Sequence, residues 1–363
     1  MLVSGGGTAS LTDAVDWPLA ARAGAVLAPA GPTAGAAELR EHVEALRASA
    51  HRAVPHVADV TRMRFADGAG PARVLVVDRA GWVRANARSM QTLLRSVPAG
   101  HVARGPATSD DDDPVAAVVG GLEIGGTLAM LSTKVLGQLE PFGDEPTLLL
   151  VAPNVLRVQR QLGLDADDFR LWVCLHEQTH ALQFGAAPWL VDHLRSRVGA
   201  LLGEVAGTAA AVGEGSALAR TRAAADLVRR FVRQPAGTPL AERLLTPDQR
   251  EQMAQVAAVM SLLEGHADVM MDVVGPKVVP SVRAIRKAFD ARRATPRGTD
   301  LVLRKVLGMD AKIAQYVDGA AFVRGVRRRA GTTALNVVWD GPQNLPTPRE
   351  ISDPAAWLRR VHG

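Results

Sequence analysis

The chain contains little cysteine and few aromatic residues. Cys174 is the only cysteine among 363 residues, so no disulfide can form within the chain, and a reducing compartment such as the cytoplasm is expected. Aromatic side chains make up 4% of the sequence, which argues against a platform that stacks the bases of single-stranded nucleic acid. Cys174 itself is interpreted as a small core residue.

Signals for secretion or membrane insertion are also missing. The first 15 residues, MLVSGGGTASLTDAV, contain neither a basic segment nor an apolar one of the kind found in signal peptides. The most apolar stretch, residues 115–136, includes Glu123, Lys134 and four glycines, so buried helices are expected there rather than a membrane span. The sequence therefore predicts a cytoplasmic protein with no membrane partner.

Charge is distributed unevenly along the chain. Residues 277–330 contain 14 Lys and Arg against 4 Asp. Basic helices can bind nucleic acid or an anionic ligand, but such a run more often forms a solvated helix surface, which is the interpretation we favour. Nucleic acid is therefore not an expected partner, and nothing in the sequence indicates an oligomeric state.

Residues 176–180 read His-Glu-Gln-Thr-His, which is the HExxH pattern. On an α-helix, positions four residues apart lie on one face, so His176 and His180 can direct their imidazoles at one cation. Glu177 lies one position further round, where its carboxylate can accept a proton from a water molecule that zinc has acidified. The pattern predicts His176 and His180 as zinc ligands and Glu177 as the catalytic base.

A second acidic pattern, Glu-Gly-His-Ala-Asp, occupies residues 264–268. It lies on a predicted helix that begins with a capping box at residues 246–249 and runs to about Met271. Two histidines and one carboxylate leave the fourth zinc position open, as in catalytic sites, so Glu264 is predicted as the third ligand. Asp268, one turn later, is predicted to accept the other ring N–H of a ligand histidine. His266 lies about 200° round the helix from Glu264 and is not expected to bind the metal.

A purely structural role for these residues is the alternative. HExxH fixes only three positions, so it can arise by chance, and the polar side chains could simply satisfy one another inside the core. The residues on either side, 169–175 and 181–184, are largely apolar. In such a buried helix, two histidines and a glutamate would destabilise the fold without partners. We therefore favour a metal site with zinc as its ion.

Hydrophobic periodicity indicates a mainly α protein with a small β-sheet, an α+β fold class. Short strands are predicted at Arg73–Val77 and Leu148–Ala152, and helices at 36–54, 114–137, 155–163, 168–184, 188–235, 247–272 and 279–330, with a break near 296–298. The tail from residue 331 is rich in turn signals. We divide the chain into an N-terminal helical and small-sheet part, residues 1–113, and a catalytic part, residues 114–363. A single compact unit is the alternative.

Long blocks of the sequence resemble a known family. HEQTH followed by LLEGHADVMMDVVGP is similar to the gluzincin type of metallopeptidase. More closely, the chain resembles a bacterial family of zincin-like metallohydrolases that is often labelled as associated with biosynthesis of the deazaflavin coenzyme. The resemblance extends over nearly the whole chain, through VDWPLAARAGAVLAP, GGLEIGGTLAMLSTKVLGQ, DFRLWVCLHEQTHALQF and QYVDGAAFV. Leu139 departs from it, at a position where the family usually has an aromatic residue.

The resemblance implies a zincin-like core and further site features. In zincins, an edge strand upstream of the active-site helix pairs with the extended substrate, and Leu148–Ala152 is the candidate here. Zincins also stabilise the oxyanion with zinc and a Tyr, His or Arg side chain. Tyr316, the only tyrosine, is our candidate, with Arg324 or His193 as substitutes. A packing role with a hydrogen-bonded hydroxyl is an equally good interpretation of Tyr316.

These observations predict a zinc-dependent hydrolase, peptidase-like, in which a zinc-activated water attacks an amide bond of a peptide or small amide substrate. Two alternatives remain. One is a zinc hydrolase of a non-peptide amide or ester in coenzyme metabolism. The other is a catalytically silent zinc-binding interaction protein, against which the presence of Glu177 argues, because this residue has no role as a ligand.

Overall fold

The computed structural model describes residues 15–95, 114–143, 145–200, 246–294 and 309–363. These residues form mainly α-helices and one three-stranded sheet, which confirms the predicted fold class. Among the described helices, none is long and apolar enough to cross a membrane. The chain divides into two compact units. The first comprises Met1–Ala28, Val83–Leu131 and Leu194–Met253, and the second comprises Pro29–Trp82, Ser132–His193 and Ala254–Gly363. The predicted boundary between residues 113 and 114 does not coincide with this division.

In the first unit, helix α1 (Trp17–Leu27) packs against helix α4 (Pro114–Leu131). Glycines allow the two backbones to approach closely. A Cβ atom on Gly24 would lie 2.6 Å from the carbonyl oxygen of Gly125, and one on Gly121 would lie 2.7 Å from that of Asp16. Helix α3 (Arg79–Arg95) enters this unit at Val83. Residues 114–131 therefore pack with the N-terminal segment, which is why the predicted boundary differs.

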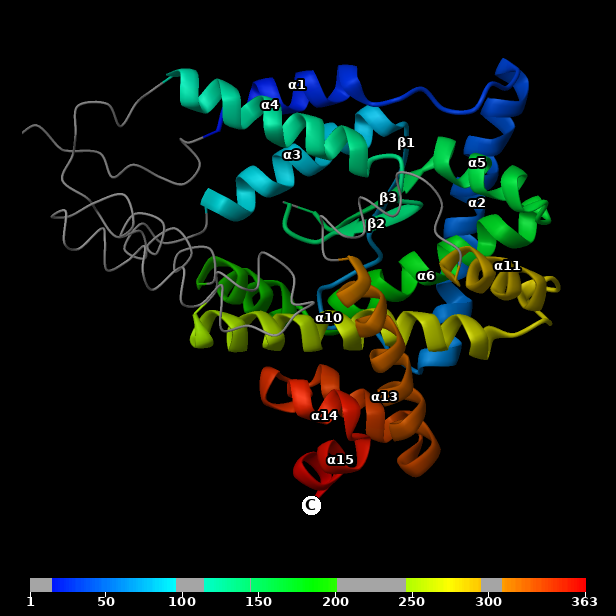
Figure 1. The fold of residues 1–363 in the computed structure, drawn as a ribbon. Coiled ribbons are helices and arrows are strands. Elements are labelled where there is room, and N and C mark those ends of the chain that lie inside the picture. Colours follow the sequence, from blue (N-terminus) through cyan, green and yellow to red (C-terminus); the bar gives the residue numbers. More distant parts are fainter. Residues whose placement is uncertain (1–14, 96–113, 144, 201–245, 295–308) are drawn as a thin grey trace, which may run out of the picture. The chain divides into compact units, whose positions relative to one another are not determined.

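The second unit contains the sheet, whose strands lie in the order β1-β3-β2 (Figure 1). Strand β1 (Arg73–Val77) runs parallel to β3 (Thr147–Val151), and β2 (Gly137–Glu140) runs antiparallel to it. The strand predicted at Leu148–Ala152 thus exists, but it is the central strand and not an edge. The described edges are β1 and β2. Leu148 through Val151 are all buried, as in a central strand of a sheet that is covered on both faces.

Helix α2 (Ala36–Thr61) packs along helix α6 (Ala166–Ala186), which follows α5 (Ala152–Leu162). The helix predicted over 36–54 is confirmed and continues to Thr61. Buried Gln178 of α6 donates from Nε2 to the Ala50 carbonyl oxygen at 3.1 Å. Cys174 is fully buried and faces the Leu46 carbonyl, as expected for a core residue. Burial raises the pKa of its thiol far above the usual range, so this cysteine is unreactive.

Helices α10 (Pro247–Val274) and α13 (Met309–Asn336) cross with their backbones in contact. A Cβ atom on Gly265 would lie 2.1 Å from the carbonyl carbon of Gly319. One on Gly319 would lie 1.8 Å from the Ser261 carbonyl oxygen. The predicted capping box of α10 is confirmed, since Thr246 Oγ1 accepts the Gln249 N–H at 3.1 Å. The two glycines permit a helix crossing directly beside residue 264.

The C-terminal tail contains two helices that the turn signals did not predict, α14 (Pro348–Ser352) and α15 (Pro354–His362). Trp357 of α15 is fully buried and its ring packs edge-on against Phe322 of α13. Arg360 donates to both carboxylate oxygens of Glu350, at 2.7 and 2.9 Å. This ion pair fixes α15 against α14.

Candidate metal centre

Helix α6 places the two histidines of the HExxH pattern side by side. The helix begins after Asp165, whose carboxylate caps it by accepting the Asp168 N–H at 2.9 Å. One turn separates His176 from His180, and their ring centroids are 4.7 Å apart. Their Nε2 atoms lie 3.1 Å from each other. Two neutral rings in this arrangement would direct lone pairs at one another unless a proton or a cation lay between them.

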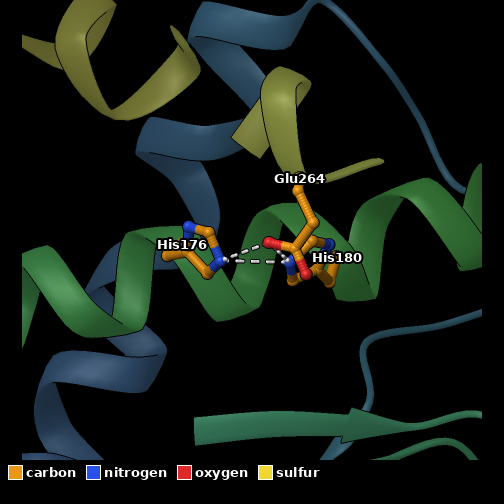
Figure 2. A group of neighbouring side chains, drawn as sticks. All are labelled: His176, His180 and Glu264. Atoms are coloured by element: carbon orange, nitrogen blue, oxygen red, sulfur yellow. Dashed lines mark hydrogen bonds and ion pairs between the residues drawn. The ribbon is translucent and has the colours of Figure 1, made fainter. Parts of the chain in front are cut away.

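Glu264 of α10 supplies the third group. Figure 2 shows its carboxylate reaching from the neighbouring helix toward both histidine rings. Its Oε2 atom lies 3.3 Å from His176 Nε2 and 3.5 Å from His180 Nε2. The three side chains are 12 to 23% exposed, so the group is largely but not completely closed to solvent. The structure thus brings the three predicted ligands together.

The triangle of ligand atoms fits a zinc ion. Tetrahedral zinc with bonds of about 2.0–2.1 Å places its ligand atoms about 3.3 Å apart. The three observed separations, 3.1, 3.3 and 3.5 Å, surround this value. Among the described residues, His176, His180 and Glu264 form the group of side chains that lie close enough together to hold a metal ion. Glu264 Oε2 is buried and faces the two histidine nitrogen atoms at 3.3 and 3.5 Å, so this carboxylate oxygen requires a proton or a cation beside it.

His180 and Glu264 also shift each other's pKa. Burial would lower the pKa of His180, but the Glu264 carboxylate outweighs burial and raises the pKa to about 9. Burial would likewise raise the pKa of Glu264, but His180 and His176 outweigh it and hold the pKa well below its usual range. Glu264 is therefore anionic at neutral pH, which is the charge state required of a metal ligand.

Glu177 lies beside the triangle and has a different environment. Its side chain is buried, and burial raises the pKa of its carboxyl group although the two histidines act against this. Its Oε2 atom has no hydrogen-bond partner among the described residues. Strand β2 lies directly against it, since a Cβ atom on Gly137 would be 2.6 Å from Glu177 Cγ and 2.8 Å from Oε1. Glu177 is thus placed next to the ligands without being one of them.

The outer nitrogen atoms of the two histidines face residues that the sequence did not single out. His180 Nδ1 lies 2.8 Å from Gln183 Oε1, and His176 Nδ1 lies 3.2 Å from Met271 Sδ. Gln183 stands three residues after His180, so helical spacing alone could have identified it. Met271 follows Glu264 by two turns, and its thioether is a weak acceptor.

Asp268 does not occupy the position predicted for it. Its carboxylate accepts Arg286 Nη1 of helix α11 (Val282–Ala294) at 2.5 Å, and its carbonyl oxygen accepts Nη2 of the same side chain. Arg286 also pairs with Asp272 and lies over the Trp172 ring, 5.6 Å from its centroid. Asp268 lies on the same helix face as Glu264, but one turn further along α10. There the Arg286 guanidinium of α11 binds its carboxylate instead. The predicted hydrogen bond to a ligand histidine is therefore wrong for this structure.

His266 faces away from the triangle, as expected. Its ring is fully buried, with Nδ1 3.0 Å from Gln183 Nε2 and the Trp339 ring edge-on at 5.3 Å. Burial, reinforced by the charge on His180, lowers the pKa of His266 to about 3, so the ring is neutral. Its hydrogen-bond contact with the site is through Gln183.

The oxyanion-donor candidates occupy different places. Tyr316 belongs to α13, one turn before Gly319 at the crossing with α10, but its side chain is outside the described residues. His193 lies on the helical stretch 189–200 with its ring edge-on to Trp189. Arg324 is exposed on α13 and acts electrostatically on Asp272. The donor therefore stays a prediction.

Comparisons with known proteins agree with this geometry. A crystal structure of a protein from Chloroflexus aurantiacus, described as "a putative hydrolase with a novel fold", is similar to this chain with a TM-score of 0.65 and 29% identity, covering 96% of this chain and 99% of that one. No curated protein matches the chain. The sequence pattern of the zincin-like metallopeptidases matches residues 15–358. With that match extending over nearly its whole length, the chain belongs to the zincin-like metallopeptidase family.

Proposed function

We propose that the protein is a zinc-dependent hydrolase that cleaves amide bonds, with His176, His180 and Glu264 as the zinc ligands. The observation that carries the proposal is the triangle of Nε2, Nε2 and Oε2 atoms, whose sides suit tetrahedral zinc. A closed structural site would contain a fourth protein ligand. Among the described side chains the proposed ligand group has three members, so the fourth coordination position of a zinc ion would be open to water or substrate.

Zinc bound there would polarise the substrate carbonyl and lower the pKa of a water molecule to about 7. Glu177 accepts a proton from the attacking water as its oxygen bonds to the carbonyl carbon. The raised pKa of this buried carboxyl makes its anion a stronger base than an exposed glutamate. Glu177 then delivers the proton to the leaving nitrogen as the C–N bond breaks, so the products are a carboxylic acid and an amine.

A peptide-like substrate agrees with the place of β2. This strand forms an edge of the described sheet and touches the proposed base through Gly137. Extended peptides bind to proteins by adding a strand to such an edge. Small amides or esters, including those of coenzyme metabolism, need only the three ligands and the base, and a substrate screen has to include them.

The test compares the zinc-loaded protein with Glu177→Gln on a mixed peptide library and a panel of small amides and esters. We expect wild-type cleavage and a loss of about a hundredfold or more in Glu177→Gln, because removal of a general base has effects of that size. Zinc content should be unchanged in this variant. Glu44→Gln, on the exposed surface of α2, is the matched control and should cleave like wild type. A zinc-loaded protein that cleaves nothing, or a fully active Glu177→Gln, would overturn the proposal.

A further inference from the structure

Gln183 connects a proposed zinc ligand on α6 to the backbone beside another on α10. Its amide is fully buried. Oε1 lies 2.8 Å from His180 Nδ1, and Nε2 lies 2.9 Å from the Leu263 carbonyl oxygen and 3.0 Å from His266 Nδ1. Both amide hydrogens and one oxygen lone pair are therefore used. Leu263 immediately precedes Glu264, so one side chain contacts both ligand-bearing helices beside their ligands.

These contacts determine which way the amide points. A carbonyl oxygen can only accept a hydrogen bond, so the atom facing Leu263 has to be the amide nitrogen. The reversed amide would place two oxygen atoms 2.9 Å apart in a buried site, which is destabilising. Oε1 consequently faces His180 and can only accept. Nδ1 of His180 must then carry a hydrogen, and its lone pair for a metal lies on Nε2.

We infer that Gln183 is a positioning residue, which keeps a hydrogen on His180 Nδ1 and so presents Nε2 to the metal while it ties α6 to α10. The inference rests on the proposed zinc site. It assigns to a glutamine the role that a carboxylate or carbonyl often has behind a metal-bound histidine. The other ligand histidine lacks an equivalent, because the group behind His176 is the Met271 thioether. Gln183 therefore orients His180 more firmly than Met271 orients His176 before metal binds, because a thioether is a weak acceptor.

The first test measures zinc affinity by competition with a chromogenic chelator. Gln183→Leu removes the acceptor, and we expect about tenfold to hundredfold weaker binding of Zn²⁺, the usual effect of losing such a partner. Gln183→Glu retains an acceptor for His180 but loses the donors, so affinity should stay near wild type while the metal-free protein unfolds at a lower temperature. Gln178→Leu is the control: Gln178 is a buried glutamine of the same helix that donates to the Ala50 carbonyl oxygen, so its loss should lower stability without lowering affinity.

The second test needs no variant of Gln183. Nitrogen-15 spectra of the metal-free protein, in alkaline buffer where the ring is neutral, should show His180 with its hydrogen on Nδ1, with the signal assigned by its absence from His180→Ala. A hydrogen on Nε2 instead would overturn the inference. So would folded Gln183→Leu that binds zinc like wild type, or Gln178→Leu that is equally impaired. If wild type binds no zinc, the proposed function fails, while the spectra still decide the orientation of His180.

Discussion

The two glutamates of the site have opposite pKa shifts, which separates their roles. Two histidines lower the pKa of Glu264, so it is a permanent anion suited to hold a cation. Burial raises the pKa of Glu177, so its carboxylate is suited to take a proton. Pairs of titratable groups that are driven apart in this way commonly mark an acid–base site. Burial dominates at Glu177, whereas the two histidines dominate at Glu264.

We predict that catalysis depends on Gly137, because this residue lies directly against the Glu177 side chain. In Gly137→Ala the new Cβ would lie 2.6 to 2.8 Å from three atoms of the buried Glu177 side chain, so that carboxylate has to move. We expect kcat to fall roughly tenfold to hundredfold, since displacements of about 1 Å have such effects. Zinc content should not change, because the three atoms nearest to the new Cβ belong to Glu177, which is not a proposed ligand.

Gly70→Ala is the matched control for this experiment. Gly70 is exposed and no described atom lies within 4 Å of its Cβ position. Both variants are assayed for kcat and for bound zinc. Equal activity of the two variants would contradict the placement of Gly137 against the base.

At the residue scale, one-turn spacing on a helix predicted that His176 and His180 share a face, and the structure brings them together with Glu264. The same spacing was insufficient for Asp268, whose partner Arg286 comes from another helix. It would have been sufficient for Gln183, which stands three residues after His180. What could not be predicted is which neighbour reaches a given face, because packing between distant segments decides it.

At the scale of elements, the crossing of α10 and α13 determines where Glu264 stands. Gly265 and Gly319 leave no room for a side chain at the contact. In Gly319→Ala the Cβ would lie 1.8 Å from the Ser261 carbonyl oxygen, so the helices must separate. We expect a loss of about 1–3 kcal/mol in the free energy of unfolding, as for other overpacked positions. Zinc affinity should fall with it, because α10 carries a ligand.

Gly126→Ala is the control at this scale, measured by the same chemical denaturation and zinc titration. Gly126 lies within helix α4 with no described atom within 4 Å of its Cβ position. Alanine there should stabilise the protein by about 0.5–1 kcal/mol through its better helix propensity. A Gly319→Ala variant as stable as wild type would show that the helices do not cross so closely.

Helices were more predictable than the sheet for a physical reason. The capping box at Thr246 and the apolar flanks of His176 are local signals, and both helices form where these signals indicate. Strand β3 was also recognised from its composition. Its central position was not, because strand order depends on pairing with β1 and with β2, whose four residues have no clear pattern.

At the scale of the whole molecule, the C-terminal ion pair predicts how stability depends on pH. Burial acts to raise the pKa of Glu350, but hydrogen bonds from Arg360 and Thr347 outweigh burial and lower it. A carboxyl group whose pKa is lower in the folded state stabilises the fold above its unfolded pKa of about 4.3. That contribution is lost as the pH falls through the folded value.

Glu350→Gln should therefore be less stable than wild type at pH 7, and the difference should shrink once the pH falls below about 4. Thermal unfolding of both proteins at several pH values between 3 and 7 measures it. A difference that is independent of pH would mean that the side chain contributes packing alone and not charge.

Which segments share a compact unit could not be predicted from the sequence. Helix α4 follows a segment rich in Gly, Pro and Asp, which suggested a domain boundary at residue 114. The glycines of α4 instead pack against α1, and the segments that carry His176, His180 and Glu264 belong to one unit with residues 29–82. A close contact between two helices about a hundred residues apart requires small residues at the crossing. In the sequence these are only scattered glycines, which do not show which helices pack together.

The most direct test of the central claim is metal content, measured by plasma mass spectrometry on protein purified without a histidine tag or added metal, beside His180→Ala. We predict about one zinc ion per chain in wild type and little in the variant, because removal of one of three protein ligands removes most of the affinity of the site for zinc. A folded wild-type protein without stoichiometric zinc, or a His180→Ala variant that retains it, would contradict the account.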